Sequence, residues 1–526
     1  MIGQYTGLDW LVFIAYGLLL MGSGWYFNRR STSSEDYFRG GNTMPVWVVA
    51  VSVLATSQSA ATFLGGPDQG YRGDLSYLAS NIGAFIAAFF VARFLLPLFY
   101  RYQVFTVYEL LEKRFGEKAK KQAGLMYLFG RIFASGARLY MAAIAVSMIL
   151  YGDILAEHVI MATWLLAVIG LAYTVYGGIK TVIYSDVIQC TVYVSAALFV
   201  VYFLLAAIPV DLPQIIQALT TPADGAASKL ALIKFELDFS SAGVFNIWSV
   251  LTGFVLLNIA AFGLDQDMTQ RMLACRTAKQ GSQALVYSIV MVIPVMLVFI
   301  IIGLLLFIYY QRPDIMQSGG DGQLIPTFEG KPVTIFMYYV LNHIPPGVKG
   351  LVTVGIIAAA LSTLNSGLNS MASVLVQDLY LPQQLKAGKK HPDLHYVKAG
   401  RLAMLIVAIA LASMAGVCFY WQQYTNMPLL QFALSVMVFS YSGLLGVYFC
   451  ALFTSRGTQG TVLAALICGF VSTLLFQPYI MSFYLPLNSQ FDLGFTWQLC
   501  IGTLVAFLVC VCRTTNPQHI RQKVAA

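Results

Sequence analysis

Long apolar runs dominate the chain and return along its whole length. Thirteen segments each hold the roughly 20 mostly apolar residues that a membrane-spanning helix requires. The runs are continuous and do not alternate with a period of two, which excludes a transmembrane β-barrel. The pattern therefore predicts an all-α polytopic membrane protein with about thirteen spans, near residues 8–27, 44–66, 76–100, 122–150, 158–177, 184–208, 243–265, 283–309, 348–378, 400–421, 429–453, 460–482 and 493–512.

Lysine and arginine alternate in density from loop to loop. The loops after odd-numbered spans hold 22 of them, the opposite loops hold 6, and 3 fall within spans. Cytoplasmic loops are enriched in basic residues, so we expect a multi-pass protein of the plasma (inner) membrane with its N-terminus outside and its C-terminus in the cytoplasm. The long outer loop 310–347 contains an apolar stretch, 334–343, that predicts a short helix over the outer face.

Composition narrows the function further. Hydrophobic residues make up 58% of the 526 residues and charged residues 10%, and the mean hydropathy is +0.73. Soluble domains are about one quarter charged, so a soluble enzyme, a nucleic-acid binder and a disordered scaffold are excluded. No loop has room for an ATP-binding domain, and there is no Walker motif. The eight cysteines predict neither a disulfide framework nor a metal site.

Polar side chains within the spans are costly and usually functional. Span 2 carries four hydroxyls and an amide between Thr56 and Thr62, followed by Gly65-Gly66-Pro67. This favours a cavity lining, with helix packing through small residues as the alternative. In span 9, Ser362, Asn365, Ser366 and Asn369 recur at helical spacing on one face. Such a stripe of neutral oxygens suits Na⁺, although a packing seam would have the same pattern.

Three carboxylates also lie in or beside apolar runs. Asp186 near the start of span 6 needs a compensating cation or strong hydrogen bonds. It is interpreted either as a cation ligand or gate, or as the partner of a structural salt bridge. Asp265 and Asp267 lie at the inner end of span 7 close to Arg271. We interpret them as interfacial ion-pair partners in preference to ligands.

Four motifs together resemble the sodium/solute symporters, the family of sodium/glucose and sodium/sialic acid cotransporters. They run in family order across residues 35–460. The motifs are Glu35-Asp36-Tyr37-Phe38-Arg39-Gly40-Gly41; Tyr176-Gly177-Gly178-Ile179-Lys180-Thr181-Val182 with Asp186-Val187-Ile188-Gln189; Gly263-Leu264-Asp265-Gln266-Asp267 with Gln270-Arg271-Met272-Leu273-Ala274; and Ala359 to Asn369 with Asp378-Leu379-Tyr380.

The resemblance implies the leucine-transporter fold, in which two five-helix repeats have inverted topology. Spans 2 and 7 would be discontinuous, and the break in span 2 would lie near Ala55–Ser59. The expected organisation is an extra span and first inner loop (1–43), a first repeat (44–208), an outer loop (209–242), a second repeat (243–453), and two C-terminal spans with an inner tail (454–526).

The resemblance also implies ion ligands. A first Na⁺ site would use the carbonyls of Ala55, Gln58 and Ala359 and the hydroxyls of Ser362 and Thr363. A second site, as in the sialic acid members, would use Asp186, Ser362, Asn365 and Ser366, with Asn365 in place of a serine.

For the solute, the sialic acid members imply Ser57, Ser59, Thr62 and Asn81. They also imply an arginine of span 4, for which Arg138 is favoured over Arg131. The sugar members imply Asn258, but their span 8 lysine is lost here, which argues against a close copy of the galactose site.

These features predict a sodium-coupled symporter, not an enzyme, that imports a small polar solute by alternating access. A sugar, sialic acid or a related carboxylate all fit. Na⁺, the solute and the lipid bilayer are the expected partners, nucleic acid is not, and a monomer is the expected functional unit. The alternatives are an uncoupled solute or ion pathway and a transporter-like membrane sensor.

Overall fold

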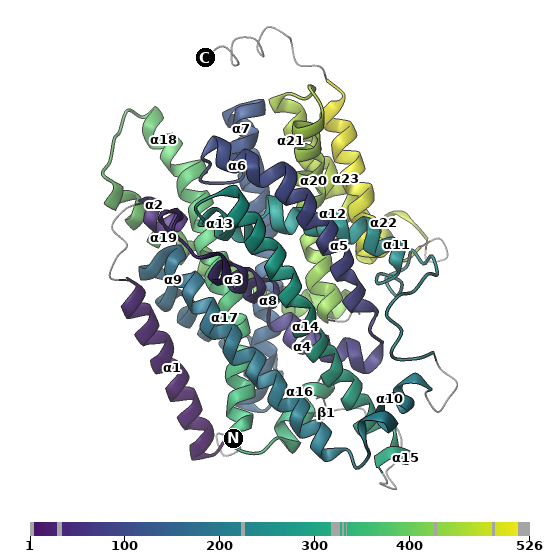
Figure 1. Ribbon diagram of the computed structural model, residues 1–526. Helices are drawn as coiled ribbons and strands as arrows, with labels where there is room; N and C mark the ends of the chain where they lie inside the picture. The colour runs from purple at the N-terminus through teal and green to yellow at the C-terminus, as the bar shows by residue number, and fades with distance from the viewer. Residues whose placement is uncertain are drawn as a thin grey trace.

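A computed structural model describes residues 5–28, 34–221, 227–316, 327–328, 331–332, 334–425, 429–486 and 490–513. Arg29, Arg30, Arg521 and Lys523, which contribute to the predicted inner charge, lie outside these residues. Figure 1 shows a bundle of long helices with shorter helices at its two ends.

All thirteen predicted spans fall on helices. Within the described ranges, ten helices are long and apolar enough to cross a membrane, or twelve if each of two bent pairs counts once, and the last predicted span is a shorter apolar helix. They are α1 (Gly7–Asn28), α3 (Val46–Ser57) with α4 (Ala60–Arg72), α5 (Ser76–Phe90) with α6 (Leu96–Tyr102), α8 (Glu117–Tyr151), the two halves of α9 (Ala156–Ala207), α11 (Ile247–Ser249) with α12 (Val255–Ile259), α14 (Ala278–Gln311), α17 (Val348–Val374) with α18 (Leu381–Lys386), α19 (Asp393–Thr425), α20 (Leu429–Phe453), α21 (Gln459–Leu475) with α22 (Pro478–Tyr484), and α23 (Phe495–Val511).

The remaining elements are short. They are α2 (Ser34–Arg39), a 3₁₀ turn (Gly40–Asn42), α7 (Glu109–Phe115), α10 (Leu212–Thr220), α13 (Gln266–Leu273), α15 (Pro313–Met316), α16 (Ile335–His343), and the antiparallel pair β1 (Thr327–Phe328) and β2 (Lys331–Pro332). Wide π-type turns at Val91–Leu95, Val250–Phe254, Ala260–Leu264 and Leu375–Tyr380 continue their neighbouring helices. The predicted short helix at 334–343 is α16, whose first turn is capped by the Thr334 hydroxyl.

The loops sort to opposite ends of the bundle. In Figure 1, α7 and α18 lie at the upper end, whereas α10, α15 and α16 lie at the lower end. Helix α1 starts at the lower end, and α23 leads to the upper end. This arrangement agrees with an odd number of crossings and with the separation of basic and less basic loops in the sequence.

Two spans are interrupted where the sequence places polar residues. Helices α3 and α4 meet at an angle of 63°, because Gln58 and Ser59 adopt extended backbone and the Ser59 hydroxyl accepts a hydrogen bond from the Ala61 N–H. A second break follows α12, where Asp265 is extended and caps α13 through the Asp267 N–H. These two spans are the ones expected to be broken in the leucine-transporter-like fold. A further bend of 86°, between α21 and α22, was not expected. The proposed repeat boundaries remain predictions.

The second half of the broken span, α4, packs tightly on α14. A Cβ atom built on Gly303 would lie 2.0 Å from the carbonyl oxygen of Pro67, and one on Gly70 would lie 2.3 Å from that of Ile300. Both partners are backbone atoms, which cannot rotate away. Glycine at these positions therefore permits α4 and α14 to approach closely, which is a common way to pack helices in a membrane.

We predict that Gly303→Ala destabilises the protein by about 1–3 kcal/mol, because the added methyl group forces α4 and α14 apart. The melting temperature of the detergent-solubilised protein measures this. Gly416→Ala on α19 is the matched control, since a Cβ there meets nothing within 4 Å. An equal loss of stability in both variants would contradict the packing argument.

Candidate functional site

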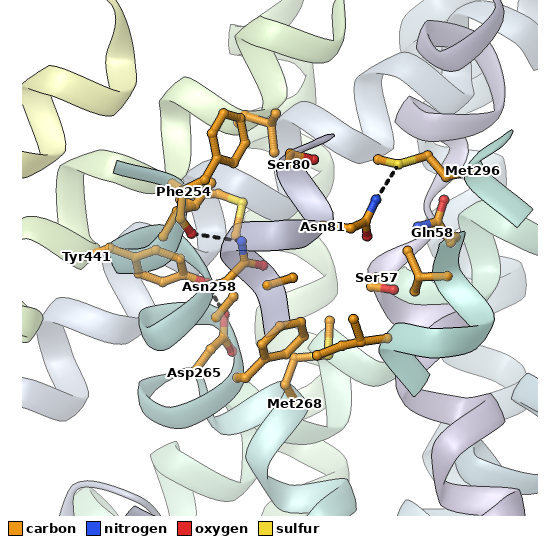
Figure 2. Close-up of a pocket in the computed structure, with 18 of the residues that line it drawn as sticks. Ser57, Gln58, Ser80, Asn81, Phe254, Asn258, Asp265, Met268, Met296 and Tyr441 are labelled. Atoms are coloured by element: carbon orange, nitrogen blue, oxygen red, sulfur yellow. Dashed lines mark hydrogen bonds between the residues drawn. The ribbon is translucent and has the colours of Figure 1, made fainter. Parts of the chain in front are cut away.

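A cavity lies between the first half of the broken span, α5, α8, α12, α14 and α20 (Figure 2). Its polar wall contains side chains from helices far apart in the chain. These are Ser57, Gln58, Tyr77, Ser80, Asn81, Arg131, Arg138, Asn258, Asp265 and Tyr441. A small second cavity adjoins it, because Arg138 lines both cavities.

Four of the six predicted solute residues line the large cavity: Ser57, Asn81, Arg138 and Asn258. Ser59 lines the small cavity together with Arg138, on the other side of the break. Thr62 is buried in the first turn of α4 and lines neither of these cavities. The structure thus gathers most of the predicted set around one space and leaves Thr62 apart from it.

A chain of buried charges runs from this cavity into the protein. The Arg131 guanidinium donates to Asp265 at 2.8 Å and also to Asp267. Arg271 donates to Asp267 at 2.7 Å and to Asp186 at 3.0 Å. With both arginines and all three carboxylates ionised, this set of five side chains carries one net negative charge.

Hydroxyl groups complete this ion-pair chain. Tyr441 donates to Asp265 at 2.6 Å, Ser366 donates to Asp267 at 3.1 Å, and Ser52 donates to Asp186 at 2.5 Å. The ion-pair chain and these hydroxyls therefore connect the broken span 2, α8, α9, α13, α17 and α20. Helix α13 provides two of the five charged groups, at Asp267 and Arg271.

The burial of this chain corrects the sequence interpretation of Asp265 and Asp267. They are ion-pair partners, as expected, but they are 1% and 0% exposed and do not lie at an interface with water. Arg271, counted among the inner-loop cations, is also fully buried. The reason is the break at Asp265, which turns α13 back into the bundle between α3, α14 and α17.

The two arginines of α8 have different partners. Arg131 and Arg138 both line the cavity. Arg131 forms ion pairs with two carboxylates, which neutralise its charge. Arg138 has no ion pair among the described residues: its Nη2 lies 3.1 Å from the Met437 sulfur, and its Nη1 has no hydrogen-bond partner. A half-buried cation without a counter-ion attracts an anion, so Arg138 is the better candidate for a negatively charged solute.

The break in span 2 lies against α17, as the first Na⁺ site requires. Ser59 and Ala60 of the break share the small cavity with Ala360 and Thr363. No described backbone N–H outside the helices donates to the carbonyls of Ala55 or Gln58. The Ser362 hydroxyl has no hydrogen-bond partner, and the Thr363 hydroxyl makes only a long contact of 3.4 Å with the Ala359 carbonyl. These oxygens remain available to a cation.

The residues of the second predicted Na⁺ site have mixed surroundings. Asp186 forms the salt bridge to Arg271 through Oδ2, while its Oδ1 has no partner. The Ser362 side chain faces this carboxylate. Both polar atoms of the Asn365 amide lack partners, and its Oδ1 lies beside Gly170 of α9. Ser366 instead donates to Asp267 and to the Thr363 carbonyl.

Several cavity residues have no counterpart in the sequence prediction. Tyr77, Ser80 and Tyr441 line the wall, and Tyr441 is hydrogen-bonded to Asp265 as Figure 2 shows. The run Ser440-Tyr441-Ser442 within the apolar span 11 is the one signal that would have indicated a functional position there. Ser80 stands next to Asn81, but nothing in the sequence distinguishes it from an ordinary small helical residue.

Comparisons with known proteins agree with this geometry. The family model described as "Sodium:solute symporter family" matches residues 37–469. The sodium/sialic acid symporter of Proteus mirabilis is 26% identical, with 89% of each chain covered. The sodium/glucose cotransporter of Vibrio parahaemolyticus is also 26% identical, covering 92% of this chain and 86% of that protein. The human sodium/iodide cotransporter is 29% identical, covering 67% and 52% respectively.

Solved structures share the fold. The substrate-bound, outward-open structure of a Na⁺-coupled sialic acid symporter superposes with a TM-score of 0.77 at 23% identity, over 96% of this chain and 97% of that one. The nucleobase-cation symporter Mhp1 in a closed conformation superposes with a TM-score of 0.57 at 13% identity, over 94% and 96%. The chain therefore belongs to the sodium:solute symporter family and is a sodium-coupled symporter, not an enzyme, that moves its solute across the membrane by alternating access.

Proposed function

We propose that the protein takes up a small organic anion together with Na⁺, and that the negative group of the solute binds Arg138. The observation that supports this most strongly is that the Arg138 guanidinium has no carboxylate partner among the described residues, in a wall where Arg131 is already neutralised. The names of the sialic acid relatives agree with an anionic solute. A neutral sugar would leave this half-buried cation without a counter-charge.

The first Na⁺ is assigned to the carbonyls of Ala55, Gln58 and Ala359 and the hydroxyls of Ser362 and Thr363. Hard cations of this kind prefer oxygen ligands, and broken helices expose backbone carbonyls for them. A Na⁺ ion there would join the broken span to α17. Because the ion binds one conformational state more tightly than the other, its gradient drives the transition.

The electrical part of that gradient is substantial. Moving one charge across 100 mV is worth about 2.3 kcal/mol, and the concentration gradient adds to it. If a monovalent anionic solute entered with one Na⁺, the two together would move no net charge across the membrane. The membrane potential would then contribute nothing to transport. A second Na⁺ bound at Asp186 would restore a net positive charge to each transport cycle, so that the membrane potential again drives uptake.

The second Na⁺ is assigned to Asp186, Ser362, Asn365 and Ser366. Support comes from the free Oδ1 of Asp186 and from the partnerless amide of Asn365. The net negative charge of the ion-pair chain favours a cation at this place. Ser366 is the weakest member of the set, since its hydroxyl is used by Asp267.

The topology that we propose places the end of the bundle with α7 and α18 in the cytoplasm, with the N-terminus outside and the C-terminus inside. The excess of Lys and Arg in the loops at that end supports it. We further propose that one chain is the transport unit, since a single chain contains both the cavity and the ion sites.

We predict that Ser362→Ala abolishes Na⁺ binding at the first site, because it removes a ligand oxygen while leaving helix α17 intact. Binding of radioactive sodium to the purified protein measures this. Ser373→Ala is the matched control, since it lies three turns along the same helix and its hydroxyl is also buried without a partner. Normal Na⁺ binding by the Ser362 variant would remove this assignment.

Asp186→Asn should convert a sigmoidal Na⁺ dependence of uptake into a hyperbolic one, with the Hill coefficient falling towards one. The substitution keeps the shape of the side chain and removes the charge that the second ion needs. Ser52→Ala serves as the control, because it deletes a hydrogen bond to the same carboxylate and preserves the charge. An unchanged Hill coefficient would contradict a second ion at Asp186.

Cysteines introduced at the two ends of the bundle should report the topology. Gln217→Cys on α10 is expected to react with a membrane-impermeant maleimide applied to intact cells. Gln383→Cys on α18 is expected to react only after the cells are permeabilised. Both tests use a background in which Cys512 is replaced, since this thiol is exposed. The reverse labelling pattern would invert the proposed orientation.

A further inference from the structure

The wall of the large cavity is chemically divided. Its polar side chains come mainly from α3, α5, α8 and α20, whereas α12, α14 and the wide turns before and after α12 contribute an apolar surface. That surface consists of Phe254, Leu257, Phe262, Ile289, Val292 and Met296. Asn258 is the one amide that interrupts it. A solute in the cavity therefore meets hydrocarbon over much of its surface.

Many polar side chains of the wall donate their hydrogen bonds to other groups of the protein. Ser57, Ser80 and Asn258 donate to carbonyls of their own helices at 2.7–2.8 Å. Asn81 donates to the Leu78 carbonyl and to the Met296 sulfur (Figure 2). Tyr441 donates to Asp265. Most of the hydroxyl and amide hydrogens of these five side chains are therefore used within the protein. The Gln58 amide and the Tyr77 hydroxyl, which also line the wall, are the neutral donors that remain among the described residues.

This distribution favours some solutes over others. A hexose or a sialic acid carries hydroxyl groups around its whole ring, and each group that is buried against hydrocarbon without a partner costs free energy. A carboxylate needs donors at one end only, and the guanidinium of Arg138 provides them there. An apolar body attached to that carboxylate gains from contact with the remaining wall.

From this we infer, building on the proposed function, that the solute is an amphipathic monocarboxylate. Its single carboxylate binds Arg138, and its aromatic or branched aliphatic body packs against the surface formed by Phe254, Leu257, Phe262, Ile289, Val292 and Met296. Sugars and polyhydroxylated acids are excluded from this site by their unpaired hydroxyls.

Thermal stabilisation of the purified full-length protein in detergent tests the inference. Benzoate, 4-methylpentanoate, benzamide, N-acetylneuraminate and glucose are compared at equal concentration, in sodium chloride and in choline chloride. We expect benzoate and 4-methylpentanoate to raise the melting temperature in sodium only. Benzamide, which has the ring of benzoate without the charge, should have no effect.

The outcomes separate this inference from the proposed function. If N-acetylneuraminate stabilises the protein and the two apolar acids do not, the amphipathic class is wrong and an anionic solute on Arg138 stands. If glucose alone stabilises it, both are wrong. If neither apolar acid has an effect in sodium, the inference is overturned whatever the other compounds do.

Two variants test the two ends of the site. Arg138→Gln should weaken benzoate binding by about tenfold or more, as expected for loss of a charged hydrogen bond, and Arg138→Lys should restore part of it. Val292→Thr keeps the volume but adds a hydroxyl to the apolar wall, and should weaken benzoate binding roughly fivefold.

Val286→Thr is the control for the apolar wall. It lies on the same helix, and its side chain is 37% exposed on the outside of the bundle. Equal benzoate affinity in the Val292 and Val286 variants, with both proteins folded, would contradict the proposed contact with the apolar wall. An Arg138→Gln protein that binds benzoate like the unmodified protein would contradict the carboxylate site.

Discussion

The structure depends on a chain of buried charges that no single helix could hold alone. Asp186, Arg271, Asp267, Arg131 and Asp265 are each at most 3% exposed, and each carboxylate contacts at least one arginine. Removing one member of such a set leaves an uncompensated charge, at a cost of about 3–5 kcal/mol for a buried pair. The helices that contribute these groups must therefore keep their mutual positions in any conformational state in which all of these ion pairs are formed.

This chain also connects the two places where transport chemistry is expected. Asp265 and Arg131 line the solute cavity, and Asp186 at the far end is a candidate cation ligand. Four ion pairs connect Asp265 at one end to Asp186 at the other. Contiguous networks of this kind can carry energetic coupling between two sites.

The break in span 2 has a similar double role. Its extended residues, Gln58 and Ser59, leave backbone carbonyls without helical partners, which is tolerated inside a membrane only beside protein or a lined cavity. The close approach of α4 to α14, through Gly70 and Gly303, holds the second half of the broken helix in place. Helix α3 and the break present Ser57 and Gln58 to the cavity. The cavity and the proposed ion site therefore meet at the same interruption.

Much of this protein was predictable from its sequence, because the relevant forces act over short stretches of chain. A run of about 20 apolar residues forms a helix in a membrane. The alternation of basic and less basic loops indicates which loops lie at the same end of the bundle. The oxygen stripe of α17 follows from helical spacing. Four of the six predicted solute residues, Ser57, Asn81, Arg138 and Asn258, line one cavity because their helices pack around it.

Only the tertiary structure decided which charges meet. Asp186 and Arg271 are 85 residues apart, and Arg131 is separated from Asp267 by 136. No local pattern encodes such pairings, since they depend on how the helices pack and on the turn at Asp265 that brings α13 into the interior. The same packing neutralises Arg131, leaves Arg138 without a counter-ion, and carries Tyr441 into the cavity wall. A residue's chemical type can be read from the chain, but its partner is determined by the packing of helices distant in sequence.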